Sequence, residues 1–270
     1  MTRPAPTIWL NGRLLPAAEA AIPPDDRGLL LADGLFETIR LSGGGPAHPL
    51  AHLARLRAGA AVLGIPVPFP DPVLLDALAS TAWDNALPDG SLRLTLTRGP
   101  GPRGLVPPII PRPTVLITAS PPAPPPLPAR LVTAASTRRN EHSPLSRLKA
   151  LAYGDNILAR AEATARGADD ALLLNTAGRL ACATAATVLV RTADDRWLTP
   201  PVADGALPGL MRARLLARSL IAEAPVDATT LAAARSILLC NSLSVRDAYA
   251  LDDRPLFPAP DVLARFRAVL

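Results

Sequence analysis

The sequence predicts a mixed α/β (α+β) fold divided into two domains. Apolar residues recur at helical spacing in some segments and alternate with polar residues in others, and both patterns occur in each half of the chain. A chain of 270 residues is also longer than one domain of ordinary size. Six prolines lie within residues 119–129, where they prevent sheet hydrogen bonds and favour a stiff, extended linker. We therefore expect a small N-terminal domain over 1–118 and a larger C-terminal domain over 130–270, joined by a linker at 119–129.

The N-terminal domain is expected to contain a hairpin, two helices and two further strands. Asn11-Gly12 is a typical hairpin turn and separates two strand-like segments. Gly64 ends one helical pattern, and Asp71-Pro72 starts another. The predicted elements are a hairpin at 7–15, helices at 50–63 and 71–86, and strands at 92–96 and 114–118.

The C-terminal domain is expected to mix both kinds of element. One predicted strand is followed by a turn at Gly178 and by a second strand. The sequence has no internal repeat, so a repeat array is excluded. Strands are predicted at 131–136, 171–175, 187–191 and 236–241, and helices directly after residue 149 and at 210–222.

Composition argues against a nucleic-acid-binding or membrane protein. Basic residues exceed acidic ones by five, but the abundance of arginine, alanine and proline is typical of a GC-rich genome rather than of a nucleic-acid surface. No run of about 18 apolar residues predicts a membrane span, and residues 1–6 lack the apolar core of a signal peptide. Two cysteines, Cys182 and Cys240, are too few for a disulfide framework. We expect a cytoplasmic protein without nucleic-acid or membrane partners.

Lys149 is the only lysine in the chain. A lysine amine can form an imine or move a proton near neutral pH, whereas arginine stays protonated. Lys149 stands at the entrance of an alanine-rich helix, which is followed by a strand, a glycine turn and a second strand. This pattern favours a chemical role, and an ordinary surface lysine is the alternative.

The segments 146–163 and 167–180 resemble the lysine region of the fold-type IV enzymes that depend on pyridoxal 5′-phosphate (PLP). This family includes branched-chain and D-amino-acid aminotransferases and aminodeoxychorismate lyase. The resemblance implies a two-domain, D-amino-acid aminotransferase-like fold, with PLP held between the domains and bound by the C-terminal one. It also implies that Lys149 is the catalytic residue, which binds the PLP aldehyde as a Schiff base, and that a homodimer completes the pocket.

Two further segments are similar to phosphate-binding elements of this family. In the segment 50–56, Arg55 matches the arginine that reaches the phosphate, and its planar fork suits phosphate oxygens. The segment 240–244 resembles the last phosphate loop, with Ser242 and Leu243 as cofactor contacts. A solvated helix arginine is the alternative for Arg55.

The segment 207–212 resembles the family's turn from a loop into a helix. Gly209 would let the backbone approach the phosphate, and the amides of Leu210 and Met211 would meet its charge. The family often has a threonine where Met211 stands, so one side-chain contact is lost. An ordinary Pro-Gly helix start is the alternative.

The partner of the pyridine nitrogen departs from the family pattern. Matching the segment 178–187 to the family places Cys182 where a glutamate is usual and Thr187 where an asparagine is usual. A carboxylate keeps the ring nitrogen protonated, whereas a neutral thiol is a weak donor. Ordinary transamination is therefore in doubt. A shifted alignment is one alternative to this match. Cys182 could otherwise be a small buried side chain or a nucleophile.

The segment 93–104 resembles the Arg-Gly-rich region of aminodeoxychorismate lyases and D-amino-acid aminotransferases. Arg103 matches the arginine that faces a substrate carboxylate, with a solvated loop arginine as the alternative. A D-amino-acid enzyme would place histidine where Leu105 stands, which counts against that activity.

The segment 26–40 is similar to the family's N-terminal signature, which forms the wall of the active site and dimer contacts. Phe36 and Thr38 are the wall candidates for substrate binding. The three histidines show no metal-site spacing, and a solvated or capping role is expected for His48, His52 and His142. We expect no metal site and no nucleotide-binding loop.

The resemblance implies an aminodeoxychorismate lyase, which acts on a small amino substrate and releases pyruvate and 4-aminobenzoate, a folate precursor. The alternative activity is that of a class IV aminotransferase for branched-chain or D-amino acids. A PLP-binding protein with little catalysis is a third hypothesis, suggested by Cys182 and Met211.

Overall fold

The computed structural model describes residues 6–270, so most of the segment 1–6, where no signal peptide is predicted, lies outside it. The chain forms two compact units, one of residues up to Pro124 with Lys149–Ala152, the other of Pro125–Leu148 and Tyr153–Leu270. The division between Pro124 and Pro125 falls within the proline-rich segment. Lys149–Ala152 differ from the predicted boundaries, because they pack with the first unit. There the Phe36 N–H donates to the carbonyl of Lys149 (2.9 Å), and the Leu151 N–H donates to that of Gly34 (3.0 Å).

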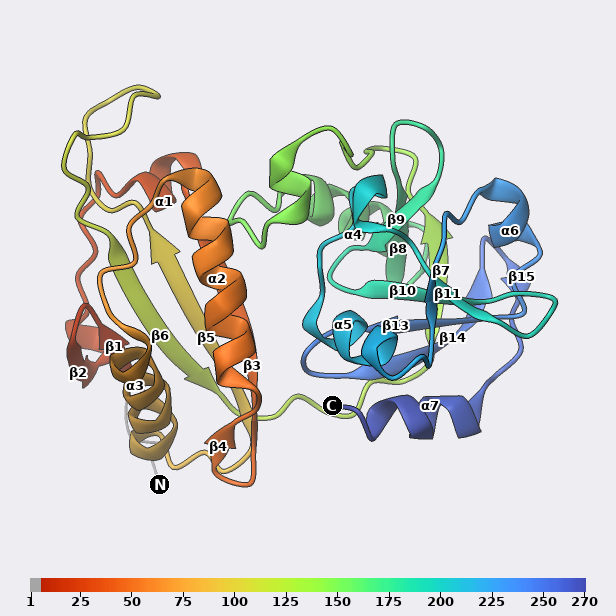
Figure 1. Ribbon diagram of the computed structural model, residues 1–270, viewed down its shortest axis with the longest axis horizontal. Coiled ribbons are helices and arrows are strands. Elements are labelled where there is room, and N and C mark those ends of the chain that lie inside the picture. The colour runs from red at the N-terminus through yellow and green to blue at the C-terminus, as the bar shows by residue number, and fades with distance from the viewer. Residues whose placement is uncertain (1–5) are drawn as a thin grey trace. The chain divides into compact units, whose positions relative to one another are not determined.

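The first unit contains a six-stranded antiparallel sheet in the order β2-β1-β6-β5-β3-β4 (Figure 1). The hairpin predicted at 7–15 is confirmed, and Asn11 (φ 48°) and Gly12 (φ 95°) form its turn. The strand over 34–42 was not predicted. The strands are β1 (Thr7–Leu10), β2 (Arg13–Pro16), β3 (Gly34–Ser42), β4 (Gly45–Pro46), β5 (Gly90–Thr97) and β6 (Thr114–Ser120).

Helices of the first unit cover its sheet. The helices predicted at 50–63 and 71–86 are confirmed as α2 (Pro49–Leu63) and α3 (Asp71–Asp84), which a 3₁₀ turn, η1 (Ala17–Glu19), and a short helix, α1 (Arg27–Leu31), precede. Figure 1 shows α2 lying along β3, against which it packs, and α3 packs on β1 and β6. Their buried faces carry mainly leucine and alanine, which fill the space between helices and sheet.

The second unit contains a nine-stranded mixed sheet in the order β12-β11-β10-β13-β14-β7-β8-β9, with β15 paired to β14. The pairs β7–β8, β7–β14 and β11–β12 are parallel. The strands are β7 (Ala129–Thr133), β8 (Asp170–Leu174), β9 (Leu180–Ala183), β10 (Thr187–Arg191), β11 (Trp197–Thr199), β12 (Ala222–Glu223), β13 (Ser236–Cys240), β14 (Val245–Leu251) and β15 (Arg254–Pro255).

The helix predicted at 210–222 is shorter than expected. It ends at Ala217, because Ser219 adopts φ 50° and the N–H groups of Ser219 and Leu220 turn back to the carbonyls of Leu216 and Leu215. The helical segments of this unit are η2 (Pro144–Arg147), α4 (Gly154–Ala165), η3 (Val202–Asp204), α5 (Leu210–Ala217), α6 (Ala228–Ala232) and α7 (Pro260–Arg267).

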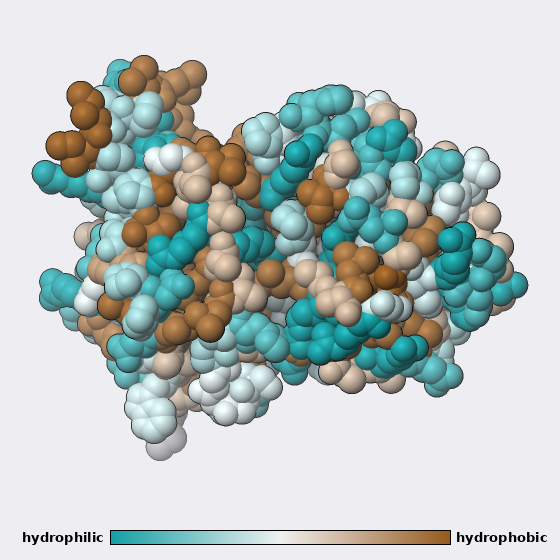
Figure 2. Space-filling view, viewed as in Figure 1, coloured by the Kyte–Doolittle hydropathy of each residue, from teal (hydrophilic) through white to brown (hydrophobic). Residues whose placement is uncertain are grey.

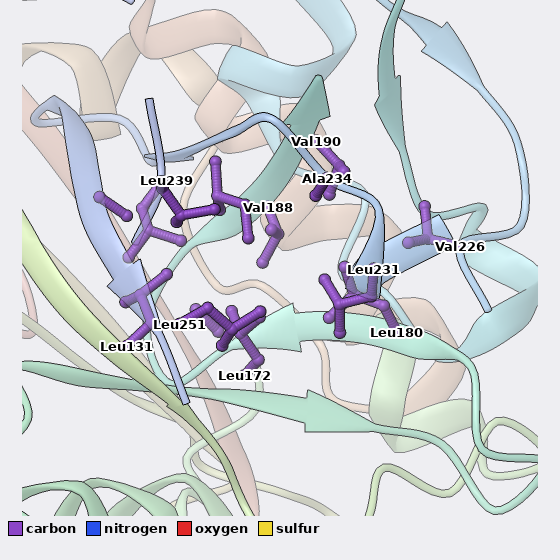
Figure 3. Packing of buried hydrophobic residues seen from close by; sticks show 14 of the residues in the cluster. Leu131, Leu172, Leu180, Val188, Val190, Val226, Leu231, Ala234, Leu239 and Leu251 are labelled. Carbon is purple, nitrogen blue, oxygen red and sulfur yellow. The ribbon is translucent and has the colours of Figure 1, made fainter. Parts of the chain in front are cut away.

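The main core of the second unit joins strands that are distant in the sheet order. Leu180 of β9 and Val188 of β10 belong to one buried cluster, together with Leu131, Leu172 and Leu239 (Figure 3). Since β9 and β10 share this cluster without being hydrogen-bonded neighbours, the sheet curves around it. Burial of this cluster stabilises the sheet, and with it the ends of the strands from which the candidate site is built.

Within residues 6–270, no helix combines the length and apolar character required to cross a membrane. Both cysteines, Cys182 and Cys240, are free thiols.

Candidate functional site

In the first unit, Lys149 lies beside an aromatic ring and a second cation. Its Nζ is 4.2 Å from the centroid of the Phe36 ring, and the Cζ atom of Arg93 is 3.8 Å from the same centroid. Both distances are within the range of cation–π attraction. Strand β3 supplies Phe36, and β5 supplies Arg93, whose register partner is Thr38. The structure therefore brings Lys149, Phe36 and Thr38 into one region, together with Arg93, which the sequence analysis had not selected.

The environment of Lys149 makes its amine easier to deprotonate than that of an exposed lysine. Burial lowers the pKa of the amine to about 8; the nearby Glu37 carboxylate opposes this shift, and Arg55 and Arg93 add to it. Only the neutral amine has the lone pair needed to attack a carbonyl group. Lys149 is thus more reactive near neutral pH than an exposed lysine.

Glu37 forms a buried group with two side chains of α2. Its carboxylate accepts hydrogen bonds from Arg55 Nε (2.8 Å) and Arg55 Nη2 (2.6 Å), and it lies 2.7 Å from His52 Nδ1. Burial opposes ionisation of Glu37, but the contacts from Arg55 and His52 hold its pKa below the usual value. The expectation that His52 is solvated or capping is wrong, because β3 places Glu37 under α2 and His52 is buried against it.

Arg103 is exposed on the loop between β5 and β6. Figure 2 shows hydrophobic side chains at the tip of this loop, where Leu105 and Ile109 are almost entirely exposed. Arg27 anchors the loop by donating to the carbonyls of Gly104 (2.9 Å) and Leu105 (3.0 Å).

In the second unit, α5 begins at a close backbone approach. A Cβ atom at Gly209 would lie 2.9 Å from Thr187 Oγ1, so glycine lets the helix start pack against β10. The first-turn amides, including those of Leu210 and Met211, have no acceptor within an α-helix and are suited to an anion. The Met211 side chain is buried in the core with Leu215, so only its backbone can meet a ligand.

The segment 240–244 forms a tight turn at the same end of the β10–β13 pair, because Thr187 is the register partner of Cys240. The turn is fixed by Asn241, whose Oδ1 accepts from the N–H groups of Leu243 (2.9 Å) and Ser244 (3.1 Å). This brings the turn that carries Ser242 close to the start of α5. The N–H of Leu243 is already engaged by Asn241.

Cys182 lies in β9 opposite Leu173 and is half-buried. Burial raises the pKa of its thiol to about 11, although the charge of Arg139 partly offsets this shift. The thiol therefore stays protonated near neutral pH and lacks the thiolate character of a nucleophile.

Two acidic residues that the sequence analysis did not select hold the ends of the β8–β9 hairpin. Asp170 accepts from Thr184 Oγ1 (2.5 Å) and from Arg160 Nη2 (3.0 Å). Glu141 accepts from Thr176 N (3.0 Å) and Oγ1 (2.9 Å); burial opposes its ionisation, but hydrogen bonds lower its pKa to about 2. Asp170 belongs to β8 itself, but its partners lie 10 residues before it and 14 residues after it, and Glu141 lies 35 residues from Thr176, so no local sequence signal marks either carboxylate.

Comparison with known proteins places this geometry in a family context. Residues 34–247 match the model of the family described as amino-transferase class IV. Over 209 residues the chain is 34% identical to a proposed branched-chain-amino-acid aminotransferase of Methanocaldococcus jannaschii. This match covers 76% of this chain and 72% of the relative. Over 158 residues it is 32% identical to aminodeoxychorismate lyase of Bacillus subtilis, and this match covers 57% of this chain and 54% of the lyase. A crystal structure of a proposed 4-amino-4-deoxychorismate lyase from Legionella pneumophila has a TM-score of 0.84 and 28% identity, and the match covers 93% of this chain and 94% of that one.

Proposed function

The chain belongs to the amino-transferase class IV family, and from this premise we propose that it is an aminodeoxychorismate lyase, which releases pyruvate and 4-aminobenzoate. Its cofactor is pyridoxal 5′-phosphate. The choice of reaction is supported by Cys182, whose thiol stays protonated because burial raises its pKa to about 11, and which the resemblance to the family places where a glutamate is usual.

The residues of the chain fit PLP. The cofactor supplies an aldehyde that binds amines covalently and a pyridine ring that withdraws electrons from the neighbouring carbon. Lys149, a partly buried amine with a pKa of about 8, is suited to bind the aldehyde carbon. In the first unit, Arg55 offers donors that suit a phosphate dianion. In the second unit, the first turn of α5 and Ser242 offer donors of the same kind.

Lys149 has a second role in the proposed reaction. With the cofactor and substrate bound, the free amine of Lys149 would take a proton from the substrate carbon that bears the amine. When the C–O bond to the enolpyruvyl group breaks, Lys149 would give this proton to the leaving enolpyruvate, which becomes pyruvate. A pKa of about 8 suits both directions, because the amine can hold or release a proton near neutral pH. Phe36 and Arg93 form the wall next to this amine.

Cys182 favours the lyase reaction over transamination. A thiol that stays protonated can donate only a weak hydrogen bond, so it does not hold a proton on the pyridine nitrogen as a carboxylate does. Charge that develops on the substrate carbon is then stabilised less. Loss of pyruvate and aromatisation of the product ring provide a strongly downhill step, which transamination lacks.

Transamination is the second candidate. It is supported by the M. jannaschii relative, because the match to that protein covers more of this chain than the match to the B. subtilis lyase does. The donor is then a branched-chain or D-amino acid. A PLP-binding protein with little catalysis is the third.

The deciding experiment compares the two reactions in the wild type and in Cys182→Glu. We expect the wild type to release pyruvate from aminodeoxychorismate and to convert its cofactor to pyridoxamine phosphate only slowly with L- or D-amino acids. The new carboxylate should raise the transamination rate about tenfold or more and the lyase rate less, since about 1.4 kcal/mol of extra stabilisation corresponds to tenfold. Single-turnover absorbance and pyruvate release measure the two rates.

Cys182→Ser is the matched control, because serine is small and neutral like the thiol. It should leave the ratio of the two rates near the wild-type value. Fast wild-type transamination without pyruvate release would refute the lyase proposal, and the absence of both reactions would favour the binding protein.

A further prediction concerns the start of α5. In Gly209→Ala the backbone (φ −67°) is compatible with alanine, but the new Cβ lies 2.9 Å from Thr187 Oγ1, so α5 or Thr187 must move. We expect PLP affinity to fall about tenfold. This loss corresponds to about 1.4 kcal/mol, which lies within the usual cost of overpacking. Titration of the PLP-free enzyme with PLP measures this change.

Gly154→Ala is the control for this substitution. Gly154 is the first residue of α4, and an added Cβ there meets open space. Its PLP affinity should stay within about twofold of the wild type. Equal losses in both variants would show that the close approach at Gly209 does not serve the cofactor.

A further inference from the structure

Glu37 is a fully buried carboxylate in the first unit. Its side chain is 1% exposed, and those of His52 and Arg55 are 3% and 13% exposed. An isolated charge in such a place would be strongly unfavourable, so a buried carboxylate requires cationic or donor partners. Glu37 has both, since it binds the guanidinium of Arg55 through two oxygens and lies within hydrogen-bond distance of His52.

The secondary structure explains how these three residues meet. Alternate residues of a strand point to opposite faces, so Glu37 shares the buried face of β3 with Leu35 and Ile39, while Phe36 lies on the other face. His52 and Arg55 are three residues apart on α2 and therefore neighbour each other on one side of that helix. Packing of α2 against β3 brings both over Glu37.

The contact between Glu37 and Arg55 fixes the orientation of the guanidinium. Arg55 Nε and Nη2 donate to separate oxygens of the carboxylate, at 2.8 and 2.6 Å, which is the planar fork arrangement. Such a pair holds both the position and the plane of the guanidinium. A free arginine side chain loses conformational freedom when a ligand orders it, and this loss weakens binding. His52 in turn orients the carboxylate through Oε2.

We propose that Glu37, oriented by His52, is the positioning residue that prepares Arg55 for the phosphate of the cofactor. The inference rests on the proposed function, in which Arg55 contacts that phosphate. Glu37 itself is not a catalytic residue, since it acts through Arg55. The role differs from a general contribution to folding, because it predicts an effect that depends on the phosphate group of the ligand.

The test compares PLP with pyridoxal, which has the same aldehyde and ring but no phosphate. Both are titrated into the PLP-free wild type and into Glu37→Gln, a variant that keeps the shape of the side chain and removes its charge. We expect PLP affinity to fall about tenfold and pyridoxal affinity to change less than about twofold, the loss corresponding to one charged hydrogen bond. Any change in the reactivity of Lys149 affects both ligands and cancels in their ratio.

A double-mutant cycle with Arg55→Lys makes the test specific. If Glu37 acts through Arg55, Glu37→Gln should have little further effect on the PLP-to-pyridoxal ratio once Arg55 is lysine. Where Glu37→Gln folds poorly, His52→Gln provides a milder change, and we expect the ratio to move in the same direction by about two- to fivefold. The ³¹P resonance of the holoenzyme gives a second readout of the phosphate environment.

The outcomes separate this inference from the proposed function. Equal loss of PLP and pyridoxal affinity in Glu37→Gln, or additive effects in the cycle, would overturn the positioning role and leave Arg55 as a phosphate contact. An unchanged ratio in Arg55→Lys would overturn both the phosphate role of Arg55 and the inference. Pyruvate release by the wild type is measured independently of either result.

Discussion

Replacing Lys149 with arginine is expected to abolish covalent binding of PLP and to lower turnover by roughly 10²- to 10⁴-fold, the usual contribution of a positioned proton-transfer group. Arginine keeps the positive charge and much of the length of lysine, but it stays protonated and has no nucleophilic amine. Lys149 is also the only lysine, so no other ε-amine in the chain can replace it. Borohydride reduction followed by peptide mapping should place the pyridoxyl group on Lys149 in the wild type and nowhere in the variant.

The same uniqueness allows the amine to be observed directly. Protein labelled with ¹⁵N-lysine gives one Nζ signal, whose titration reports the pKa of Lys149 in the PLP-free enzyme. We expect a midpoint near 8, because burial disfavours the charged amine. A midpoint near the ordinary value of 10.5, or a pyridoxyl group found on the N-terminal amine, would contradict the assignment.

Secondary structure was predictable where local residues determine the backbone. The Asn11-Gly12 turn fixed the hairpin, and glycine at 64 marked the end of α2. Strand β3 was missed, because its conformation depends on pairing with β5, which the local pattern does not reveal. The end of α5 was also missed: the sequence beyond Ala217 remains compatible with helix, but the chain turns at Ser219 and then pairs as β12.

The candidate site was predictable only in part. The uniqueness of Lys149 and the glycine at 209 are visible in the sequence, and the structure gives each a physical basis. The link between Glu37 and Arg55 was not predicted, because it joins a strand to a helix that follows it in the chain. A usable signal was present: Glu37 is a lone carboxylate on the apolar face of β3, and such a residue needs a cationic partner.

Asp33→Ala is expected to destabilise the protein by about 3 kcal/mol, the lower end of the cost of leaving a buried charge without its partner. Asp33 accepts hydrogen bonds from Arg27 Nε (2.9 Å), Arg98 Nε (2.6 Å) and Arg98 Nη2 (3.1 Å). The side chains of Arg27 and Arg98 are only 5% and 9% exposed, so water cannot replace the carboxylate fully. Denaturant unfolding at neutral pH measures the change in free energy.

Asp71→Ala is the matched control, since Asp71 pairs with Arg57 where both side chains are more than one third exposed. Its cost should be no more than about 1 kcal/mol. Burial opposes ionisation of Asp33, but the hydrogen bonds from Arg98 and Arg27 hold its pKa below its ordinary value of 3.8. A carboxylate with a lowered pKa stabilises the fold above its unfolded pKa, and this contribution is lost as the pH falls through the folded pKa. The difference between wild type and Asp33→Ala should therefore be constant above about pH 5 and shrink below about pH 4. A difference that stays unchanged in acid would mean that Asp33 stabilises the first unit by packing rather than by its charge.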